Sequence, residues 1–147
     1  MAHDFKKFPE LTNRQMELYY NESPHKQIVD TFQARVVKIT DGDTIRVTCE
    51  FRDFDFPVKL IDVQAPEKNE GGYRESKEAL IEKILGEEVD VIVNPNERVG
   101  KWGRILGKIY HGGININEEM IREGHAVEFS KKEKPIPIIE EMLNWRS

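Results

Sequence analysis

Cysteine is almost absent from this chain of 147 residues, which contains only Cys49. One cysteine cannot form a disulfide within the chain, and it cannot build a cysteine-based zinc cluster. Long apolar stretches are missing too, since no run approaches the roughly 18 residues that a membrane helix needs. The start, MAHDFKKFPELT, has no apolar stretch after its lysines, which predicts no secretory signal. We therefore expect a cytoplasmic protein without membrane contact, although a mature secreted chain would look the same.

An excess of positive charge is also missing, because 22 lysines and arginines stand against 27 acids and the net charge is −5. This balance argues against a surface coated in basic residues that holds duplex nucleic acid nonspecifically, but it leaves room for a local basic groove. Residues 67–90 carry more anions than cations. Cations gather instead in residues 97–108, at Arg98, Lys101, Arg104 and Lys108. This segregation fits either an anion-binding patch beside an acidic helix or two ordinary solvated faces.

The first residues differ in pattern from the rest of the chain. We predict an N-terminal extension over residues 1–32, partly helical, ahead of a domain that covers residues 33–147. Within the extension, residues 11–22 suit a short helix with Thr12 as its N-cap, and Pro24 then breaks it. The extension is expected either to pack on the main domain or to meet a protein partner.

The main domain shows strand signals separated by turn signals. Strands are predicted over residues 34–39, 44–51, 58–63, 88–94 and 104–110. The Asp41-Gly42 pair is a strong hairpin signal between the first two of them, and residues 53–57 are expected to form a turn before the third. A short strand is expected near Val127.

Helices are expected between and after these strands. One covers residues 73–85, a second is capped by Asn115 or Asn117 and ends at Gly124, and a last one covers residues 136–145. The order of three strands, helix, two strands and helix predicts an α+β fold, a five-stranded OB-type Greek-key β-barrel with about three helices. Such barrels often bind oligonucleotides, but the fold alone does not imply a function.

Four blocks of sequence give the chain a likeness to a known family. They are VVKITDGDTIRV, VKLIDVQAPE, GKWGRILGKIY and NEEMIREGHA. In order and spacing they resemble the staphylococcal nuclease (thermonuclease, SNase-like) family, over roughly residues 33–130. The resemblance implies an OB barrel that carries a Ca²⁺-dependent phosphodiesterase, a hydrolase acting on nucleic acid.

The resemblance also implies roles for particular residues. The metal ligands fall on Asp43 and Gln64, with Asp41 as an outer neighbour. Glu67 falls on the glutamate that helps to activate or position water. The remaining positions grip the phosphate or contact the substrate: Arg104, Lys59, Lys101 and Trp102.

Two of these positions depart from the family pattern. Gln64 stands where active members have an aspartate, so its amide oxygen would bring no negative charge to Ca²⁺. Lys59 stands where they have an arginine, so it keeps the charge but loses the planar fork that holds two phosphate oxygens. Asp62 is the candidate replacement for the missing carboxylate, because residues 62 and 64 share one face of a strand. The two residues are about 6.6 Å apart along that strand, which requires backbone movement or a bridging water.

Each surviving residue has a structural explanation as well. Asp43 in its turn can accept backbone N–H bonds, Glu67 can be a solvated carboxylate, Arg104 can pair with either acid, and Trp102 can cover the barrel mouth. Three functions therefore stay open. The first is binding of single-stranded DNA, RNA or nucleotide phosphate with weak or absent Ca²⁺-dependent hydrolysis. The second is an active Ca²⁺-dependent endonuclease, and the third is a protein-interaction scaffold that uses residues 1–32.

Overall fold

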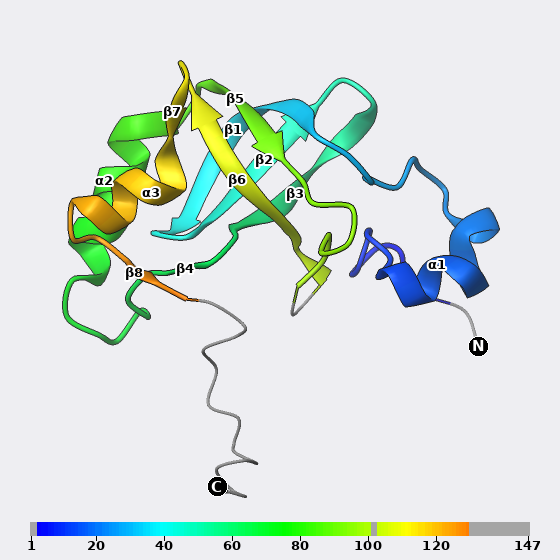
Figure 1. Cartoon of the computed structure of the whole chain (residues 1–147). Helices are drawn as coiled ribbons and strands as arrows, with labels where there is room; N and C mark the ends of the chain where they lie inside the picture. The colour runs from blue at the N-terminus through cyan, green and yellow to red at the C-terminus, as the bar shows by residue number, and fades with distance from the viewer. Residues whose placement is uncertain (1–2, 101–102, 130–147) are drawn as a thin grey trace, which may run out of the picture.

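The computed structural model of the protein describes residues 3–100 and 103–129, and a closed β-barrel forms its centre (Figure 1). The barrel strands are β1 (Phe32–Asp41), β2 (Thr44–Cys49), β3 (Arg52–Leu60), β5 (Glu88–Ile92) and β6 (Ile105–His111). They pair in the order β3-β2-β1-β5-β6, with antiparallel neighbours. Parallel pairing of β3 with β6, which places Val58 opposite Ile105, closes the barrel. The predicted five-stranded α+β barrel is confirmed.

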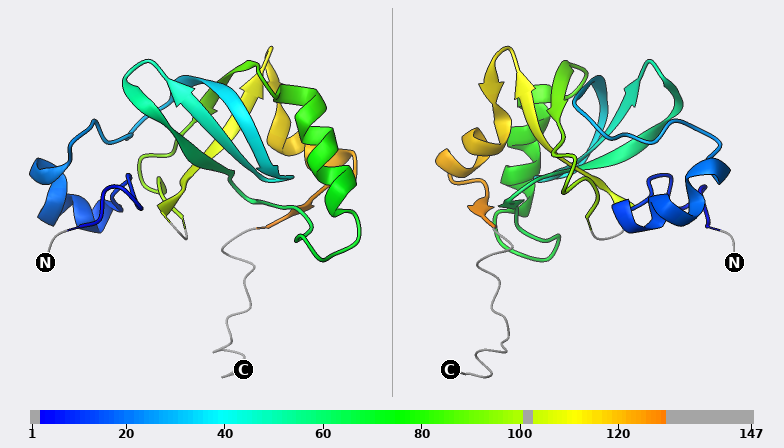
Figure 2. Two further views of the ribbon diagram at one scale, coloured as in Figure 1. Left: turned by 180° about the vertical axis from the view of Figure 1, so that it is seen from behind. Right: turned by 45° about the vertical axis from the view of Figure 1, so that its right-hand side comes forward.

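Shorter strands and the helices surround this barrel. Strand β7 (Ile114–Asn115) pairs antiparallel with the end of β6, and β4 (Val63–Gln64) pairs with β8 (Val127–Glu128). The helices are α1 (Asn13–Tyr19), the 3₁₀ turn η1 (Tyr20–Glu22), α2 (Tyr73–Ile84) and α3 (Ile116–Arg122). Helices α2 and α3 lie together at one end of the barrel, and α1 lies at the other (Figures 1 and 2). None of the helices in the described ranges has the length and apolar composition that crossing a bilayer would take.

Local signals in the sequence account for several element ends. Thr12 caps α1, as predicted, and it also forms a capping box with Gln15. The side chain of Asn115 caps α3 by accepting from the N–H of Glu118. Gly86 follows α2 with φ +81°, the left-handed conformation that favours glycine after a helix. The prediction of Thr12 as a cap is confirmed, and of the two candidates for α3 the structure selects Asn115. Such caps can be predicted because each depends only on neighbouring residues.

The core is built by alternate strand positions and by one face of α2. Its fully buried side chains include Val36, Ile45, Val47, Phe56, Val58, Leu60, Leu80, Ile84, Ile105 and Ile109. The prediction of a turn over residues 53–57 is wrong, because β3 already begins at Arg52 and runs through them. Phe56 is buried opposite Val47, and this burial outweighs the turn signal of Asp53 and Pro57. Pro57 fits because β6 pairs with β3 only from Val58 onward.

Candidate functional site

Asp43 lies in the turn between β1 and β2, where it is buried and held on several sides. Its Oδ1 accepts a hydrogen bond from the hydroxyl of Thr44 at 3.1 Å. Its Oδ2 accepts from the backbone N–H of Ala65 at 2.8 Å, and its carbonyl accepts from the N–H of Leu60, also at 2.8 Å. Through its carbonyl and its carboxylate, Asp43 therefore joins the β1–β2 turn to the end of β3 and to the segment after β4.

Lys59, on β3, brings a positive charge to this carboxylate. Its Nζ lies 3.6 Å from Asp43 Oδ2, and it donates to the carbonyls of Leu60 at 3.0 Å and Val63 at 2.5 Å. Burial lowers the pKa of Lys59 below its ordinary value, the charge of Asp43 opposes that shift, and the nearby charge of Arg104 adds to it. The ammonium group is thus surrounded by three protein oxygens.

Asp41 shares this environment with Asp43. Burial, a hydrogen bond with Asp43 and the charge of Asp43 raise the pKa of Asp41 to about 6. Burial would raise the pKa of Asp43 as well, but the hydrogen bond with Asp41 and the charge of Lys59 outweigh burial and lower that pKa. Two neighbouring carboxyl groups thus have pKa values on opposite sides of the ordinary value, as expected for a pair that competes for one proton.

Arg104 reaches the same cluster from the start of β6. Its Nη1 donates to Thr44 Oγ1 at 3.3 Å, and Thr44 in turn donates to Asp43. Thr44 is the member of the cluster that sequence reasoning does not single out, although its place directly after Asp43 in the DGDT motif is a usable signal. The structure therefore brings together Asp41, Asp43, Lys59 and Arg104, and we call these four residues with Thr44 the Asp43 cluster.

Glu67 lies in the exposed loop that follows β4. Its backbone N–H donates to the side chain of Glu70 at 2.7 Å, and its carbonyl accepts from the N–H of Glu70 at 2.8 Å. These contacts shape the loop through backbone atoms of Glu67. Lys101 and Trp102 lie outside the residues that the structure describes.

The expectation that residues 62 and 64 share one strand face is wrong. Strand β3 ends at Leu60, and the chain turns at Ile61-Asp62 before β4 begins. Asp62 has φ +62°, the left-handed conformation, and it lines a different hollow from the one that Gln64 lines. The turn is held from outside, because Asn117 donates its Nδ2 to the carbonyl of Ile61 at 3.0 Å. Asp62 is therefore directed away from the position of Gln64.

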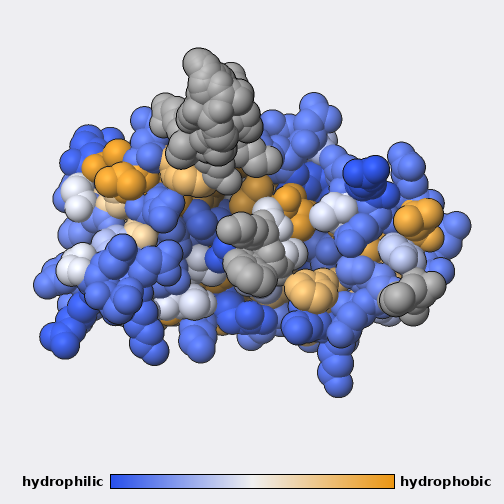
Figure 3. Space-filling view, turned by 90° about the horizontal axis from the view of Figure 1, so that it is seen from below, coloured by the Kyte–Doolittle hydropathy of each residue, from blue (hydrophilic) through white to orange (hydrophobic). Residues whose placement is uncertain are grey.

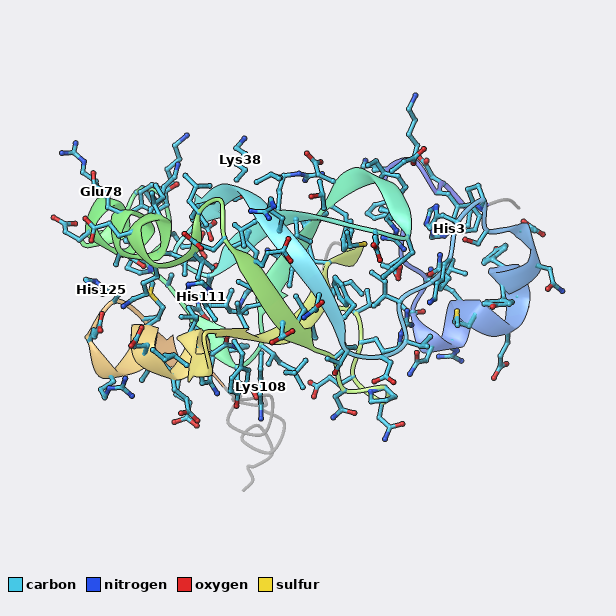
Figure 4. The ribbon with its side chains drawn as sticks, turned by 90° about the horizontal axis from the view of Figure 1, so that it is seen from above. His3, Lys38, Glu78, Lys108, His111 and His125 are labelled. Carbon is cyan, nitrogen blue, oxygen red and sulfur yellow. The ribbon has the colours of Figure 1, made fainter. Side chains whose placement is uncertain are left out.

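The side chains that the structure describes do not fit a divalent cation in their present arrangement. Ca²⁺ takes six to eight oxygen ligands. In residues 3–100 and 103–129, no group of three or more His, Cys, Asp or Glu is placed to hold a metal ion. The carboxylate of Asp43 already accepts two hydrogen bonds and faces the ammonium of Lys59, while Gln64 is exposed on β4. Figure 4 also shows His3, His111 and His125 on separate parts of the molecule.

The cations of residues 97–108 do not all lie on the surface. Arg98 is only 3% exposed and pairs with Glu10, so it does not present its charge to solvent. Lys108 is exposed on β6 (Figure 4). Spacing along the chain cannot reveal this, because the partner of Arg98 comes from the N-terminal segment, 88 residues earlier.

Comparison with known proteins supports the resemblance to the staphylococcal nuclease family. The family described as "Staphylococcal nuclease homologue" matches residues 57–146. A protein from Escherichia coli named "Uncharacterized endonuclease" is 36% identical over 93 residues, which are 63% of this chain and 58% of that protein. A "Micrococcal nuclease" from Shigella flexneri is 33% identical over 113 residues, 71% of this chain and 62% of that protein. The chain thus spans about three fifths of the length of these relatives. By its barrel, its DGDT turn and these matches, the chain belongs to the staphylococcal nuclease family.

Proposed function

We propose that this protein binds the phosphates of single-stranded DNA or RNA at the Asp43 cluster, with weak or absent Ca²⁺-dependent hydrolysis. The observation that carries the proposal is the ammonium of Lys59, which is held by Asp43 and the carbonyls of Leu60 and Val63. This arrangement neutralises the acid that the family pattern gives to calcium. Membership of a nuclease family supports nucleic acid as the ligand.

Arg104 is the residue that we expect to contact phosphate directly. A guanidinium presents N–H groups in a fork that matches two phosphate oxygens, which a lysine ammonium does not. The face of the molecule shown in Figure 3 is mostly hydrophilic, with hydrophobic residues in separate small patches. A polar, charged ligand suits such a face better than an extended apolar partner does.

An active Ca²⁺-dependent endonuclease is the second candidate, and the names of the two relatives favour it. In that case Glu67 would assist the attacking water, and Arg104 with Lys59 would hold the phosphate. A third candidate is a contact between residues 1–32 and another protein. The exposed side chains of Leu18 and Tyr20, 72% and 57% accessible, favour that contact.

The deciding experiment follows cleavage of labelled single-stranded DNA and RNA while Ca²⁺ is titrated. The native protein is compared with a double variant, Gln64→Asp with Lys59→Arg, which restores the family pattern at both positions. We expect the native protein to bind without cutting, or to cut far more slowly than the double variant. Cleavage by the native protein that a chelator abolishes would establish the second candidate instead.

Binding is measured separately from cleavage. Replacement of Arg104 by Ala should weaken binding to all sequences alike and should lower the slope of log K against log salt by about 0.7, the value for one phosphate contact on a single strand. Arg35→Ala is the matched control, because Arg35 is an exposed arginine that pairs with Glu88 on the barrel surface. Absence of any salt-dependent binding by the native protein would remove the proposal.

A further inference from the structure

Glu10 is a carboxylate buried at the junction of the N-terminal segment (residues 3–31) and the barrel. It is 2% exposed, with its Oε2 2.7 Å from Arg52 and its Oε1 3.3 Å from Arg98. The N–H of Ile28 also donates to it, at 3.0 Å and 3.2 Å. A buried carboxylate needs such partners. Removal of the acid would strongly destabilise the folded protein, because the buried arginine charges would then be uncompensated. Glu10 therefore fixes the N-terminal segment to two arginines of the main domain.

Arg98 extends this attachment across the N-terminal segment. Its Nε donates to the carbonyl of Ile28 at 2.6 Å, and its Nη1 donates to the carbonyl of Leu11 and to Asn13 Oδ1, each at 2.9 Å. Asn13 also donates to the carbonyl of Pro95 at 3.0 Å. Figures 1 and 2 show the N-terminal segment beside the connection from β5 to β6, which contains Pro95 and Arg98.

Residues 98–100 and 103–106 pair with each other, and we call these two stretches the hairpin that carries Arg104. The N–H of Leu106 donates to the carbonyl of Arg98 at 2.9 Å, and the N–H of Gly100 donates to the carbonyl of Arg104 at 2.8 Å. Gly103, directly before Arg104, has φ +70°, and a Cβ there would lie 3.1 Å from the ring of Phe8. The N-terminal segment thus holds this hairpin at Arg98 and packs on it at Gly103.

We propose that the N-terminal segment positions Arg104 for the phosphate, with Glu10 and Phe8 as positioning residues. Glu10 fixes the side chain of Arg98, which is the first residue of the hairpin. The hairpin in turn positions the guanidinium of Arg104 beside Thr44. Phe8 packs against Gly103, the residue directly before Arg104. The nucleic-acid readout of this inference rests on the proposed function, whereas the order of the hairpin can be measured in the free protein.

The first test is amide hydrogen exchange of the free protein. Glu10→Gln removes the charge but keeps the size of the side chain. We expect exchange at the amides of Gly100 and Leu106 to become at least tenfold faster, while the amide of His125, bonded to Met120 on the far side of the barrel, stays unchanged. Glu88→Gln is the matched control, because Glu88 forms an exposed ion pair with Arg35.

Phe8→Ala is a second variant that leaves the buried charges intact, in case Glu10→Gln unfolds the protein. It should accelerate exchange at Gly100 in the same selective manner. Unchanged exchange in the hairpin of a folded variant would overturn the inference. Equal acceleration at His125 would also overturn it, because that result indicates a loss of global stability without a specific effect on the hairpin.

The second test is a double-mutant cycle with Arg104→Ala, in which the affinity for single-stranded DNA is measured. If the N-terminal segment acts through Arg104, then Phe8→Ala weakens binding about tenfold in the native background and has no effect when Arg104 is already Ala. Equal losses in both backgrounds would overturn the inference. If the native protein does not bind DNA or RNA at all, the proposed function fails, and the exchange experiment still decides the role of the N-terminal segment.

Discussion

The Nζ atom of Lys59 lies 3.6 Å from Oδ2 of Asp43 and donates to the carbonyls of Leu60 and Val63. A lysine side chain thus contributes positive charge beside the acid that the family pattern assigns to calcium. The ammonium carries one charge where Ca²⁺ carries two, and the chain holds it in place. This relationship predicts that Lys59 and a divalent cation compete for the same carboxylate.

Replacement of Lys59 by Met tests this competition directly. Met keeps much of the apolar stem and removes the charge, so the buried carboxylate of Asp43 loses its counter-ion. We expect the free energy of unfolding at neutral pH to fall by about 2 kcal/mol. Addition of CaCl₂ should then raise the melting temperature of the variant more than that of the native protein.

Lys38→Met, at an exposed position on β1 (Figure 4), is the control and should change neither the free energy of unfolding nor the response to CaCl₂. An equal response to CaCl₂ in native and Lys59→Met proteins would contradict the competition.

Asp41 should make stability depend on pH in an identifiable window. Its pKa of about 6 in the folded protein lies above the ordinary value of 3.8. The stabilisation of the folded state that Asp41 provides is therefore fully present below about pH 4, and it is lost as the pH rises through 6. Asp41→Asn stays neutral at every pH and escapes this loss. We expect the stability of the variant relative to the native protein to increase by about 1.5 kcal/mol between pH 4 and pH 7, a value reduced for partial exposure of the carboxyl group.

Urea unfolding at several pH values between 4 and 7 measures this difference. Asn69→Ala, in an exposed loop, changes no titratable group and is the control, so its difference should not vary over this window. A flat difference for Asp41→Asn would show that its carboxyl group titrates normally.

Gly42 should not tolerate a side chain. A Cβ at this position would lie 1.8 Å from Oγ of Ser76 and 2.9 Å from Cβ of Ala65, so Gly42→Ala should cost about 2 to 3 kcal/mol of folding stability. Thermal or chemical unfolding checks the loss. Gly71→Ala is the control, because a Cβ there would meet no atom within 4 Å. Addition of Ser76→Gly should recover part of the stability, and failure to recover any would place the strain elsewhere.

Asn117 should be costly to replace, since it joins α3 to β6 and to the turn at Ile61. Its Oδ1 accepts from the N–H of Ile109 at 3.0 Å, and its Nδ2 donates to the carbonyls of Ile61 and Gly107. Asn117→Ala removes the acceptor of the buried Ile109 N–H and the donor to the Ile61 carbonyl, whereas the carbonyl of Gly107 still accepts from the N–H of Ile61. We expect a loss of about 3 kcal/mol. Asn69→Ala, in an exposed loop, should change stability by less than about 0.5 kcal/mol. A loss below 1 kcal/mol for Asn117→Ala would mean that water replaces the amide.

The prediction of strands and caps succeeds where a residue's role depends on its neighbours in the chain. Thr12 and Asn115 cap their helices because a cap bonds to an N–H three residues ahead. The prediction fails at residues 53–57, where turn-forming residue types occupy a strand. Burial of Phe56 and pairing with β2 decide that segment, and both involve residues distant in the sequence.

The site shows the same division between local and distant causes. The DGDT turn, the alternation of apolar residues and the two departures at Lys59 and Gln64 can all be read from the sequence. Only the tertiary structure decides that the ammonium of Lys59 meets Asp43, that Asp62 turns away from Gln64, and that Arg98 is buried. The physical reason is that charge pairing and desolvation depend on distance in space, and closure of the barrel brings β1, β3 and β6 together.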